Sequence, residues 1–250
     1  AHRSGPHRKG TVHPPHLDLR LDGFRATDEQ TEEAFRDAIG IDHADLIPLA
    51  EHHTPEGTSY HLLHHAAATW GTPGEPQLIA LHLWRDLREK TFGFTHAPLP
   101  LVAMARSWLV HRGCPREKIR LAPDTGTAAA DETTRALEDR LTYEGNHFAL
   151  LDSYTDDDPD HAATVVILRS LDEHSPSPFR VLYETVDTAS RTHTLREGGF
   201  TTHTEALRWC GDALAGKAAP LPPFRPTVRP GPQPISVPQG VGHRAAGRGR

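Results

Sequence analysis

The chain has 250 residues, enough for one or two domains that each bury a core, and 36% of the residues are hydrophobic, as in ordinary globular proteins. No apolar run approaches the roughly 20 residues that span a bilayer, and the N-terminus lacks the apolar segment of a signal peptide. The formal net charge is −6, and Cys114 and Cys210 are too few for a disulfide framework, so we expect a reducing, cytoplasmic location without membrane contact.

The two ends of the chain are basic and differ from the rest in composition. Residues 1–16 contain three Lys and Arg residues and residues 217–250 contain six, and neither segment contains an acidic residue. Both are rich in Pro and Gly and poor in large apolar residues, which predicts disorder. Residues 17–216 hold the other 18 basic residues and all 33 acidic ones, a net charge of −15. Such an acidic body repels phosphate backbones, so we expect nucleic-acid binding only through the tails, and only weakly.

Residues 17–115 have the pattern of an α+β unit. It starts with an alternating apolar stretch at 17–21, and a capping box of Thr27 and Gln30 then predicts a helix that carries Ala34, Phe35, Ala38 and Ile39. Strands are predicted at 45–50, 59–64, 77–84 and, as a short return, 91–94. Pro48 predicts that the first of these strands lies at an edge. A helix over 101–109 closes the unit and ends near Gly113 and Pro115.

The same order of elements recurs in residues 116–216. An alternating stretch at 118–121 precedes a helix that starts near Asp131, and the predicted strands are 148–154, 164–168, 179–183 and 192–195. Thr202 and Glu205 form a second capping box, which predicts a final helix through Leu214. The chain therefore divides into tail 1–16, copies 17–115 and 116–216, and tail 217–250.

Constant separations between matching residues indicate a tandem duplication. Four pairs are 102 residues apart: Phe35 and Leu137, Ile39 and Leu141, Leu46 and Phe148, Leu49 and Leu151. Leu62 and Val166 are 104 apart, as are Leu63 and Ile167, which predicts a turn two residues longer in the second copy. Three pairs are 101 apart: Leu81 and Leu182, Asp86 and Asp187, Trp108 and Trp209. The alternative is one continuous α+β domain whose pattern repeats by chance.

These patterns predict an α+β fold of two tandem copies. Each copy would consist of a helix, an antiparallel meander of three or four strands and a closing helix, with helices covering the sheet. The copies would be related by a pseudo-twofold axis, as subunits of homodimers are. Trp108 and Trp209 would anchor equivalent positions in the two cores.

Nineteen histidines raise the question of a metal site. The candidates lie around the first hairpin and on the strand expected to pair with it: His52, His53, His61, His65 and His82. Zinc requires three or four converging ligands, but no His-Glu-x-x-His or paired Cys-x-x-Cys motif is present, and the second copy lacks these histidines. The preferred interpretation is therefore half-exposed strand histidines without a metal or other cofactor.

An acidic run marks the first hairpin of the second copy and comprises Asp156, Asp157, Asp158 and Asp160. With Asp152 upstream, it has the Asp-x-Asp-x-Asp rhythm of a calcium loop. His161 and Ile167 stand where an EF-hand requires Gly and Glu, and Ile167 falls within a predicted strand. A solvated acidic tip, available to a partner and repelling edge-to-edge association, is the better interpretation.

Motifs for nucleophilic catalysis and phosphate binding are missing. The sequence contains no Gly-x-Ser-x-Gly, no P-loop and no Gly-x-Gly-x-x-Gly after a strand. Cys114 follows a helix end and Cys210 lies on an apolar helix stripe, so both are interpreted as structural. Gly198-Gly199 could form an anion-binding nest, although positioning the second capping box is the simpler role.

The leading functional hypothesis is a non-enzymatic interaction or regulatory protein whose acidic body binds a protein partner with a basic surface. It depends on the acidic body, the duplicated scaffold and the missing catalytic motifs. The alternative is a hydrolase, in one version metal-dependent, with a His/Asp site between the two copies. A second alternative is weak nucleic-acid binding through the basic tails.

Overall fold

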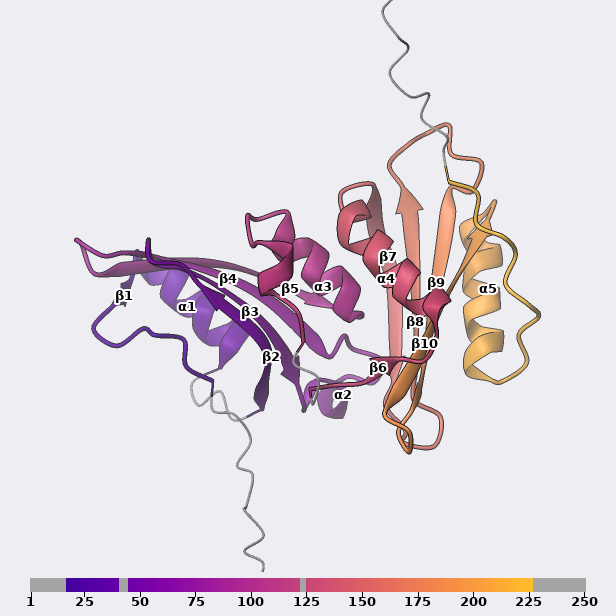
Figure 1. Ribbon diagram of the computed structural model, residues 1–250, viewed down its shortest axis with the longest axis horizontal. Coiled ribbons are helices and arrows are strands. Elements are labelled where there is room, and N and C mark those ends of the chain that lie inside the picture. Colours follow the sequence, from indigo (N-terminus) through magenta and orange to yellow (C-terminus); the bar gives the residue numbers. More distant parts are fainter. Residues whose placement is uncertain (1–16, 41–44, 122–124, 227–250) are drawn as a thin grey trace, which may run out of the picture.

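The computed structural model describes residues 17–40, 45–121 and 125–226, which form two five-stranded sheets with helices on both faces (Figure 1). The strand order is β1-β5-β4-β3-β2 in the first sheet and β6-β10-β9-β8-β7 in the second. Each sheet is an antiparallel meander of four strands, to which a two-residue strand adds in parallel. The predicted duplicated α+β fold is therefore confirmed.

The first copy contains the elements that the patterns predicted, with longer strands. Its strands are β1 (Arg25–Ala26), β2 (Leu46–His53), β3 (Thr58–His65), β4 (Leu78–Asp86) and β5 (Thr91–Leu99). Its helices are α1 (Glu29–Ile39), the short α2 (Ala68–Gly71) and α3 (Val102–Val110), followed by a 3-10 turn η1 (Arg116–Lys118). As Pro48 predicted, β2 is an edge strand.

The second copy repeats this order without a counterpart of α2. Its strands are β6 (Ala128–Ala129), β7 (Phe148–Asp156), β8 (Ala163–Ser170), β9 (Phe179–Asp187) and β10 (Thr192–Phe200). Its helices are α4 (Glu132–Glu144) and α5 (His203–Leu214). In each copy the opening helix, α1 or α4, and the closing helix, α3 or α5, cover opposite faces of the sheet (Figure 1).

Local details show that the copies share more than element order. The edge strands β2 and β7 carry a bulge at the same place, where Leu49 and Leu151 are passed over in the pairing. The hairpins β4–β5 and β9–β10 turn in the same way, with Asp86 or Asp187 accepting hydrogen bonds from the turn backbone. Four residues after each aspartate, Lys90 and Arg191 adopt a left-handed φ of 54°.

The register corrects two of the predicted separations, and with them four of the matched pairs. The N-caps Asp28 and Asp131 are 103 residues apart, so Phe35 corresponds to Glu138, not Leu137. In the sheets, Leu62 pairs with Ala80, and Ile167 pairs with Val181, so Leu62 matches Ile167 at a separation of 105. The connection between the first two long strands is therefore three residues longer in the second copy, not two. Because strand side chains alternate between faces, a shift of one residue exchanges the two faces of the sheet.

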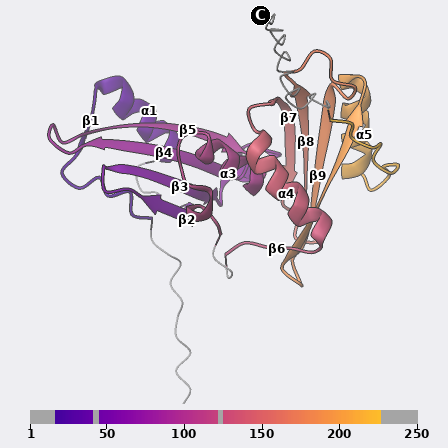
Figure 2. The ribbon, with the colours of Figure 1, turned by 45° about the horizontal axis from the view of Figure 1, so that its top comes forward.

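The two copies pack through unlike faces. Helix α3, the closing helix of the first copy, lies beside α4, the opening helix of the second, between the two sheets (Figures 1 and 2). Leu101 and Ala103 of the first copy are buried there in one core with Leu137 and Leu141 of α4. A twofold axis would pair like faces, whereas this contact is head-to-tail. The arrangement differs in this respect from the pseudo-twofold pairing expected from homodimers.

The chain leaves the two closing helices toward opposite edges of the sheets. After α3, Cys114 and Ile119 are buried in the core on the α3 face of the first sheet. After α5, residues 217–226 run the other way, and the backbone N–H of Gly199 in β10 donates to the Pro222 carbonyl. These ten residues were expected to belong to the disordered tail. They are instead ordered against the second copy, with Leu221 packed on its core.

The segment of residues 219–226, which we call the C-terminal strap, packs against Gly198 and Gly199 and explains why these positions lack a side chain. A Cβ atom at Gly198 would lie 2.5 Å from the Leu221 side chain, and one at Gly199 would lie 2.4 Å from Ser177 Oγ. Both glycines lie within β10, and the prediction that they position the capping box is wrong. They instead allow the strap to approach the edge of the sheet. Phe224 of the strap then covers the fully buried Arg180 guanidinium at 4.5 Å, next to Phe148, which lies 4.9 Å from the same group.

The helix N-caps and the first segment agree only in part with their predictions. Asp28, not Thr27, caps α1 by accepting from the Thr31 N–H, whereas Asp131 and Thr202 cap α4 and α5 as predicted. The stretch 17–21 forms no strand, but its alternation holds, because Leu17 and Leu19 are buried and Asp18 and Arg20 are exposed.

Gly199→Ala is expected to lower the free energy of unfolding by about 1–3 kcal/mol, because its Cβ would collide with Ser177 and the strap. Gly211→Ala is the matched control. A Cβ atom there has no neighbour within 4 Å, so added helix propensity should stabilise α5 by up to about 1 kcal/mol. Urea unfolding of both variants measures the difference, and equal effects would contradict the role assigned to the strap.

Candidate functional site

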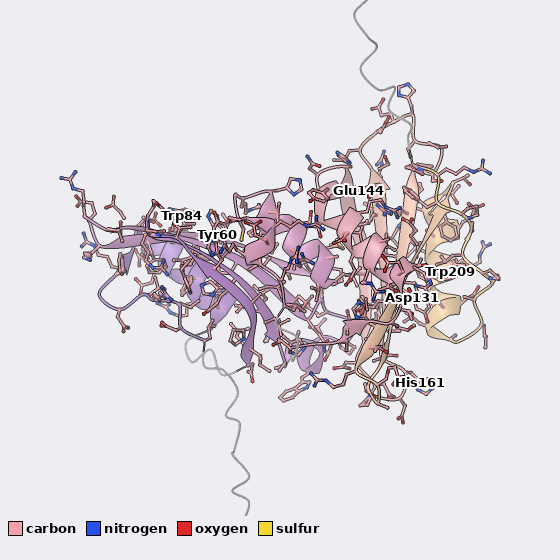
Figure 3. The ribbon with its side chains drawn as sticks, in the orientation of Figure 1. Tyr60, Trp84, Asp131, Glu144, His161 and Trp209 are labelled. Atoms are coloured by element: carbon pink, nitrogen blue, oxygen red, sulfur yellow. The ribbon has the colours of Figure 1, made fainter. Side chains whose placement is uncertain are left out.

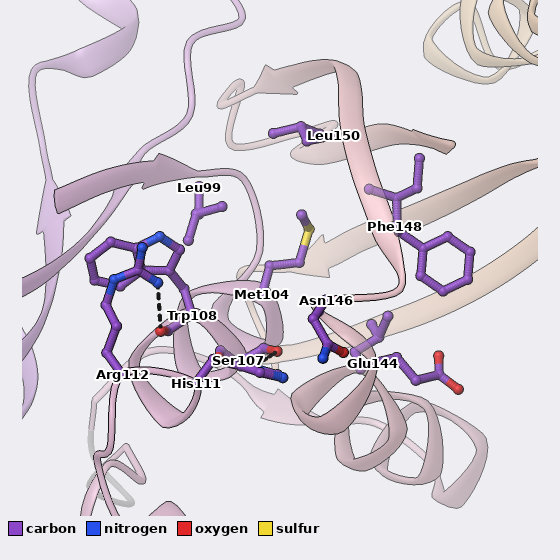
Figure 4. Close-up of a pocket in the computed structure, with 13 residues that line it drawn as sticks. Leu99, Met104, Ser107, Trp108, His111, Arg112, Glu144, Asn146, Phe148 and Leu150 are labelled. Atoms are coloured by element: carbon purple, nitrogen blue, oxygen red, sulfur yellow. Dashed lines mark hydrogen bonds between the residues drawn. The ribbon is translucent and has the colours of Figure 1, made fainter. Parts of the chain in front are cut away.

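Two hollows flank the α3–α4 contact. The smaller, with a volume of ≈ 260 Å³, lies between the C-terminal parts of the two helices and the start of β7 (Figure 4). Most of its polar side chains already have partners. Arg112 stacks on Trp108 at 3.4 Å and donates to the Trp108 carbonyl, and Glu144 pairs with Arg180 at 2.7 Å. This pocket therefore has an apolar wall and few free polar groups.

The larger hollow, which we call the acidic cleft, has a volume of ≈ 600 Å³ and is formed by both copies. The first copy contributes β2, the start of α3 and the turn before β4, mostly with apolar side chains such as Ile47, Leu49 and Val102. The second copy contributes α4, the β7–β8 loop and the α4 face of its sheet. The head-to-tail contact thus creates a cleft with one apolar and one polar wall.

Carboxylates predominate among the charged side chains that line the acidic cleft. Among the described residues that line it are four carboxylates, Glu138, Asp156, Asp157 and Glu184, and no Lys or Arg. Two histidines, His64 and His193, and three threonines add hydrogen-bonding groups. Carboxylates that share a low-dielectric hollow attract cations strongly, because the field is focused and poorly screened there.

Glu138, Glu184 and His193 form the centre of the polar wall. The His193 Nε2 atom lies 3.0 Å from a Glu138 carboxylate oxygen, and its Nδ1 atom lies 2.9 Å from the Thr127 hydroxyl. Burial raises the pKa of Glu184 to about 7, against a smaller lowering by His193. Burial alone would lower the pKa of His193, but Glu138 and Glu184 outweigh it, and the pKa is raised. Glu184 therefore titrates close to neutral pH, and His193 holds its proton to a higher pH than a free imidazole does.

The first copy shows that the fold does not need these charges. The counterparts of Glu138 and His193 are Phe35 and Phe92, whose rings pack edge to face with centroids 5.1 Å apart. The counterpart of Glu184 is the fully buried Leu83. Three apolar positions of the first copy are thus occupied by a His–Glu pair and a half-buried acid in the second. Such a change costs stability, so the requirements of the fold do not account for it.

Sequence reasoning missed this cluster because of the one-residue error in the helix alignment. At a separation of 102, Phe35 matches Leu137, and the comparison shows only apolar residues. At the separation of 103 set by the capping aspartates, Phe35 matches Glu138. The usable signal was therefore the pair of equivalent N-caps, Asp28 and Asp131, of which Asp131 is labelled in Figure 3.

The acidic run of the second copy lies at the rim of the cleft. Asp156 and Asp157 line it, and Asp157 accepts hydrogen bonds from Thr69 and Gln77 of the first copy. Asp158 and Asp160 are exposed in the loop between β7 and β8, where Asp158 accepts from the Asp160 N–H. Of the four predicted interaction residues, one therefore ties the copies together, and two are exposed to solvent.

The five histidine metal candidates are divided between the two faces of the first sheet. His52 and His82 stack on either side of Tyr60 on the α3 face. His53 and His61 meet edge to face on the α1 face, with ring centroids 5.3 Å apart, and His65 ends β3. Within the described residues, no group of three or more His, Cys, Asp or Glu side chains is arranged to hold a metal ion.

His61 is instead a fully buried imidazole whose two ring nitrogens have no hydrogen-bond partner. Burial, with smaller contributions from His53 and Arg85, lowers its pKa to about 3. Val166 occupies the same position in the second copy. Both cysteines are also buried, and burial raises the pKa of Cys114 and of Cys210 to about 12, which makes either thiol a poor nucleophile.

His61→Val should make the protein less sensitive to acid. A histidine that is neutral in the folded state and has a pKa near 6.5 when unfolded destabilises the fold as the pH falls below 6.5. Between pH 7 and pH 4.5, the wild type should lose about 3 kcal/mol more than the variant. Urea unfolding at both pH values measures this difference. His174→Val, at an exposed histidine, is the control and should follow the wild type. If His61→Val also follows the wild type, the assignment of His61 is wrong.

No described helix has the length and apolar character needed to cross a membrane. The comparisons with known proteins identify no relationship: no family model, no curated protein and no solved structure matches the chain. The function is therefore inferred from the acidic cleft.

Proposed function

We propose that the protein is a non-enzymatic interaction protein that binds a basic segment of a partner protein in the acidic cleft. The observation that carries the proposal is the replacement of Phe35, Phe92 and Leu83 of the first copy by charged or titratable residues in the second. A core of equal size and shape is possible without them, because the first copy has one. The charges are therefore best explained by something that enters the cleft.

A guanidinium or ammonium group suits this cleft in both charge and shape. It would pair with Glu184 and Glu138, and its aliphatic stem would lie against the apolar wall formed by Ile47, Leu49 and Val102. Charge-assisted hydrogen bonds of this kind are stronger than neutral ones, and they strengthen further away from bulk water. The net charge of −15 on residues 17–216 adds long-range attraction for a basic partner.

The groups that face Glu184 give the interaction a specific pH dependence. A cation binds the ionised carboxylate, and the pKa of Glu184 is raised to about 7, so affinity should rise between pH 6 and pH 8. Deprotonation of His193 acts in the same direction, because it removes a positive charge from the cleft. Burial lowers the pKa of His64 of the first copy, which favours its neutral form.

A tri-arginine amide peptide is the probe for this site, with isothermal titration calorimetry as the measurement. Glu138→Gln with Glu184→Gln should weaken binding by about tenfold or more, because both carboxylates that face the cation become neutral. Glu29→Gln with Glu33→Gln removes the same charge from the exposed face of α1 and should leave the affinity unchanged. Equal effects of the two variants, or binding that does not weaken with salt, would contradict the proposal.

A further variant separates function from folding. Glu138→Phe, Glu184→Leu and His193→Phe together install the residues of the first copy at the three positions. The protein should remain folded, by circular dichroism and urea unfolding, and should no longer bind the peptide. A folded variant that still binds would exclude these three residues as the site.

A hydrolase is the second candidate, since the same cluster also suits acid–base chemistry. Glu184 with a pKa near 7 could donate a proton while the His193–Glu138 pair activates water. A panel of chromogenic p-nitrophenyl esters, phosphates and glycosides tests this reading. Turnover that disappears in Glu184→Gln would favour the enzyme, and no turnover of any member would favour the binding protein.

A further inference from the structure

The α5 face of the second sheet is only partly covered. A groove with a volume of ≈ 270 Å³, which we call the α5 groove, lies between β7 and α5. Its lining is mainly apolar and comes from both elements and from β8: Tyr154, Val165, Ile167, Leu207, Cys210, Gly211 and Leu214. Tyr154 and Leu207 are 40% and 45% exposed, which is unusual for large apolar side chains that lie so close together.

The equivalent place in the first copy is filled by the chain itself. The counterparts of Val165, Ile167 and Cys210 are Tyr60, Leu62 and Leu109, and all three lie in one core with Cys114 and Ile119. Cys114 and Ile119, which follow α3, are 2% and 0% exposed. The Cys114 N–H donates to the Leu109 carbonyl, and the Tyr60 hydroxyl donates to the Arg112 carbonyl.

In the second copy the chain turns away from this place. The Trp209 indole donates to the Ala219 carbonyl, which directs the strap toward β10 at the opposite edge of the sheet (Trp209 is labelled in Figure 3). None of the described strap residues lines the α5 groove. Smaller residues also enlarge it, because Val165 and Gly211 replace Tyr60 and Val110. Leu207, which replaces Arg106, makes its rim more apolar.

We propose that the α5 groove binds an extended segment of a partner protein in which aliphatic residues alternate with basic ones. Residues Lys118–Leu121, which follow α3, have this pattern, with Ile119 buried in the core of the first copy and Leu121 packed against it. The charges of the groove suit such a segment. Asp152, which also contacts the His203 ring at 3.0 Å, lines it, and no Lys or Arg does so among the described residues. Strand β7 continues directly into the acidic loop that begins at Asp156.

This site is separate from the acidic cleft. Val165 and Ile167 belong to the core under α5, whereas Glu184 and His193 lie on the α4 face of the same sheet. A partner could occupy one site without the other. Failure of one proposal therefore leaves the other intact, provided that the variants are confined to one face.

The probe is a peptide with the sequence of residues 114–121 in which Cys114→Ser prevents oxidation. Titrated into the full-length, ¹⁵N-labelled protein, it should cause saturable amide shifts around Tyr154, Ile167 and Gly211. Gly211→Val should weaken binding by about tenfold, because its side chain fills the groove. The position has open space around its Cβ atom, so the helix should tolerate the change. Leu207→Arg, which installs the residue of the first copy, should have the same effect.

Leu171→Arg is the matched control, since Leu171 is 61% exposed and lies outside the groove. It should bind the peptide as the wild type does. Unchanged affinity in both groove variants, or no saturable shift at millimolar peptide, would overturn the proposal. Shifts centred on Glu184 would assign the peptide to the acidic cleft instead. Dimerisation of the protein alone that Gly211→Val abolishes would show that the occupant is a second copy.

Discussion

The contact between α3 and α4 is the constraint on which the rest of the molecule depends. It joins the closing helix of one copy to the opening helix of the next, and it buries Leu101 and Ala103 with Leu137 and Leu141. Because the contact joins non-equivalent helices, the α3 face of the first sheet lies toward the α4 face of the second. One consequence is a cleft with an apolar wall from the first copy and a charged wall from the second. Another is that, in the part of the chain that the structure describes, the outer faces of α1 and α5 are not covered by the other copy.

The duplication provides an internal reference for every substitution. Where the copies agree, as at the bulges of β2 and β7 and at the turns after Asp86 and Asp187, the residue serves the fold. Where an apolar core residue of one copy is replaced by a charged residue in the other, the fold does not explain the change. Glu138 and His193 are of this second kind. Arg180 is a different case, because its charge is paired with Glu144 and Glu197 and covered by two aromatic rings.

The segments after the closing helices decide which surfaces are available. In the first copy, Cys114 and Ile119 complete the core on the α3 face, and the second copy covers the region around Trp108. In the second copy, the strap covers the region around Trp209 and leaves the groove at β7 uncovered by described residues. The two copies thus have nearly the same framework but expose different parts of it. The asymmetry between a histidine-rich and an aspartate-rich hairpin is the smaller difference.

The sequence alone was sufficient for the duplication, the α+β class, the edge position of β2 and most helix starts. These features depend on local patterns: alternation, capping residues, Pro48 and the equal lengths of the hairpins after Asp86 and Asp187.

The sequence was not sufficient for the acidic cleft, because Glu138, Glu184 and His193 come from three separate elements and meet only when α4 packs on its sheet. Register was decisive as well, since strand side chains alternate between faces and a shift of one residue hides which face a residue occupies. Only the tertiary structure decided that the copies pack head-to-tail through α3 and α4. That choice depends on how well the side chains of α3 and α4 fit together, which periodicity does not encode.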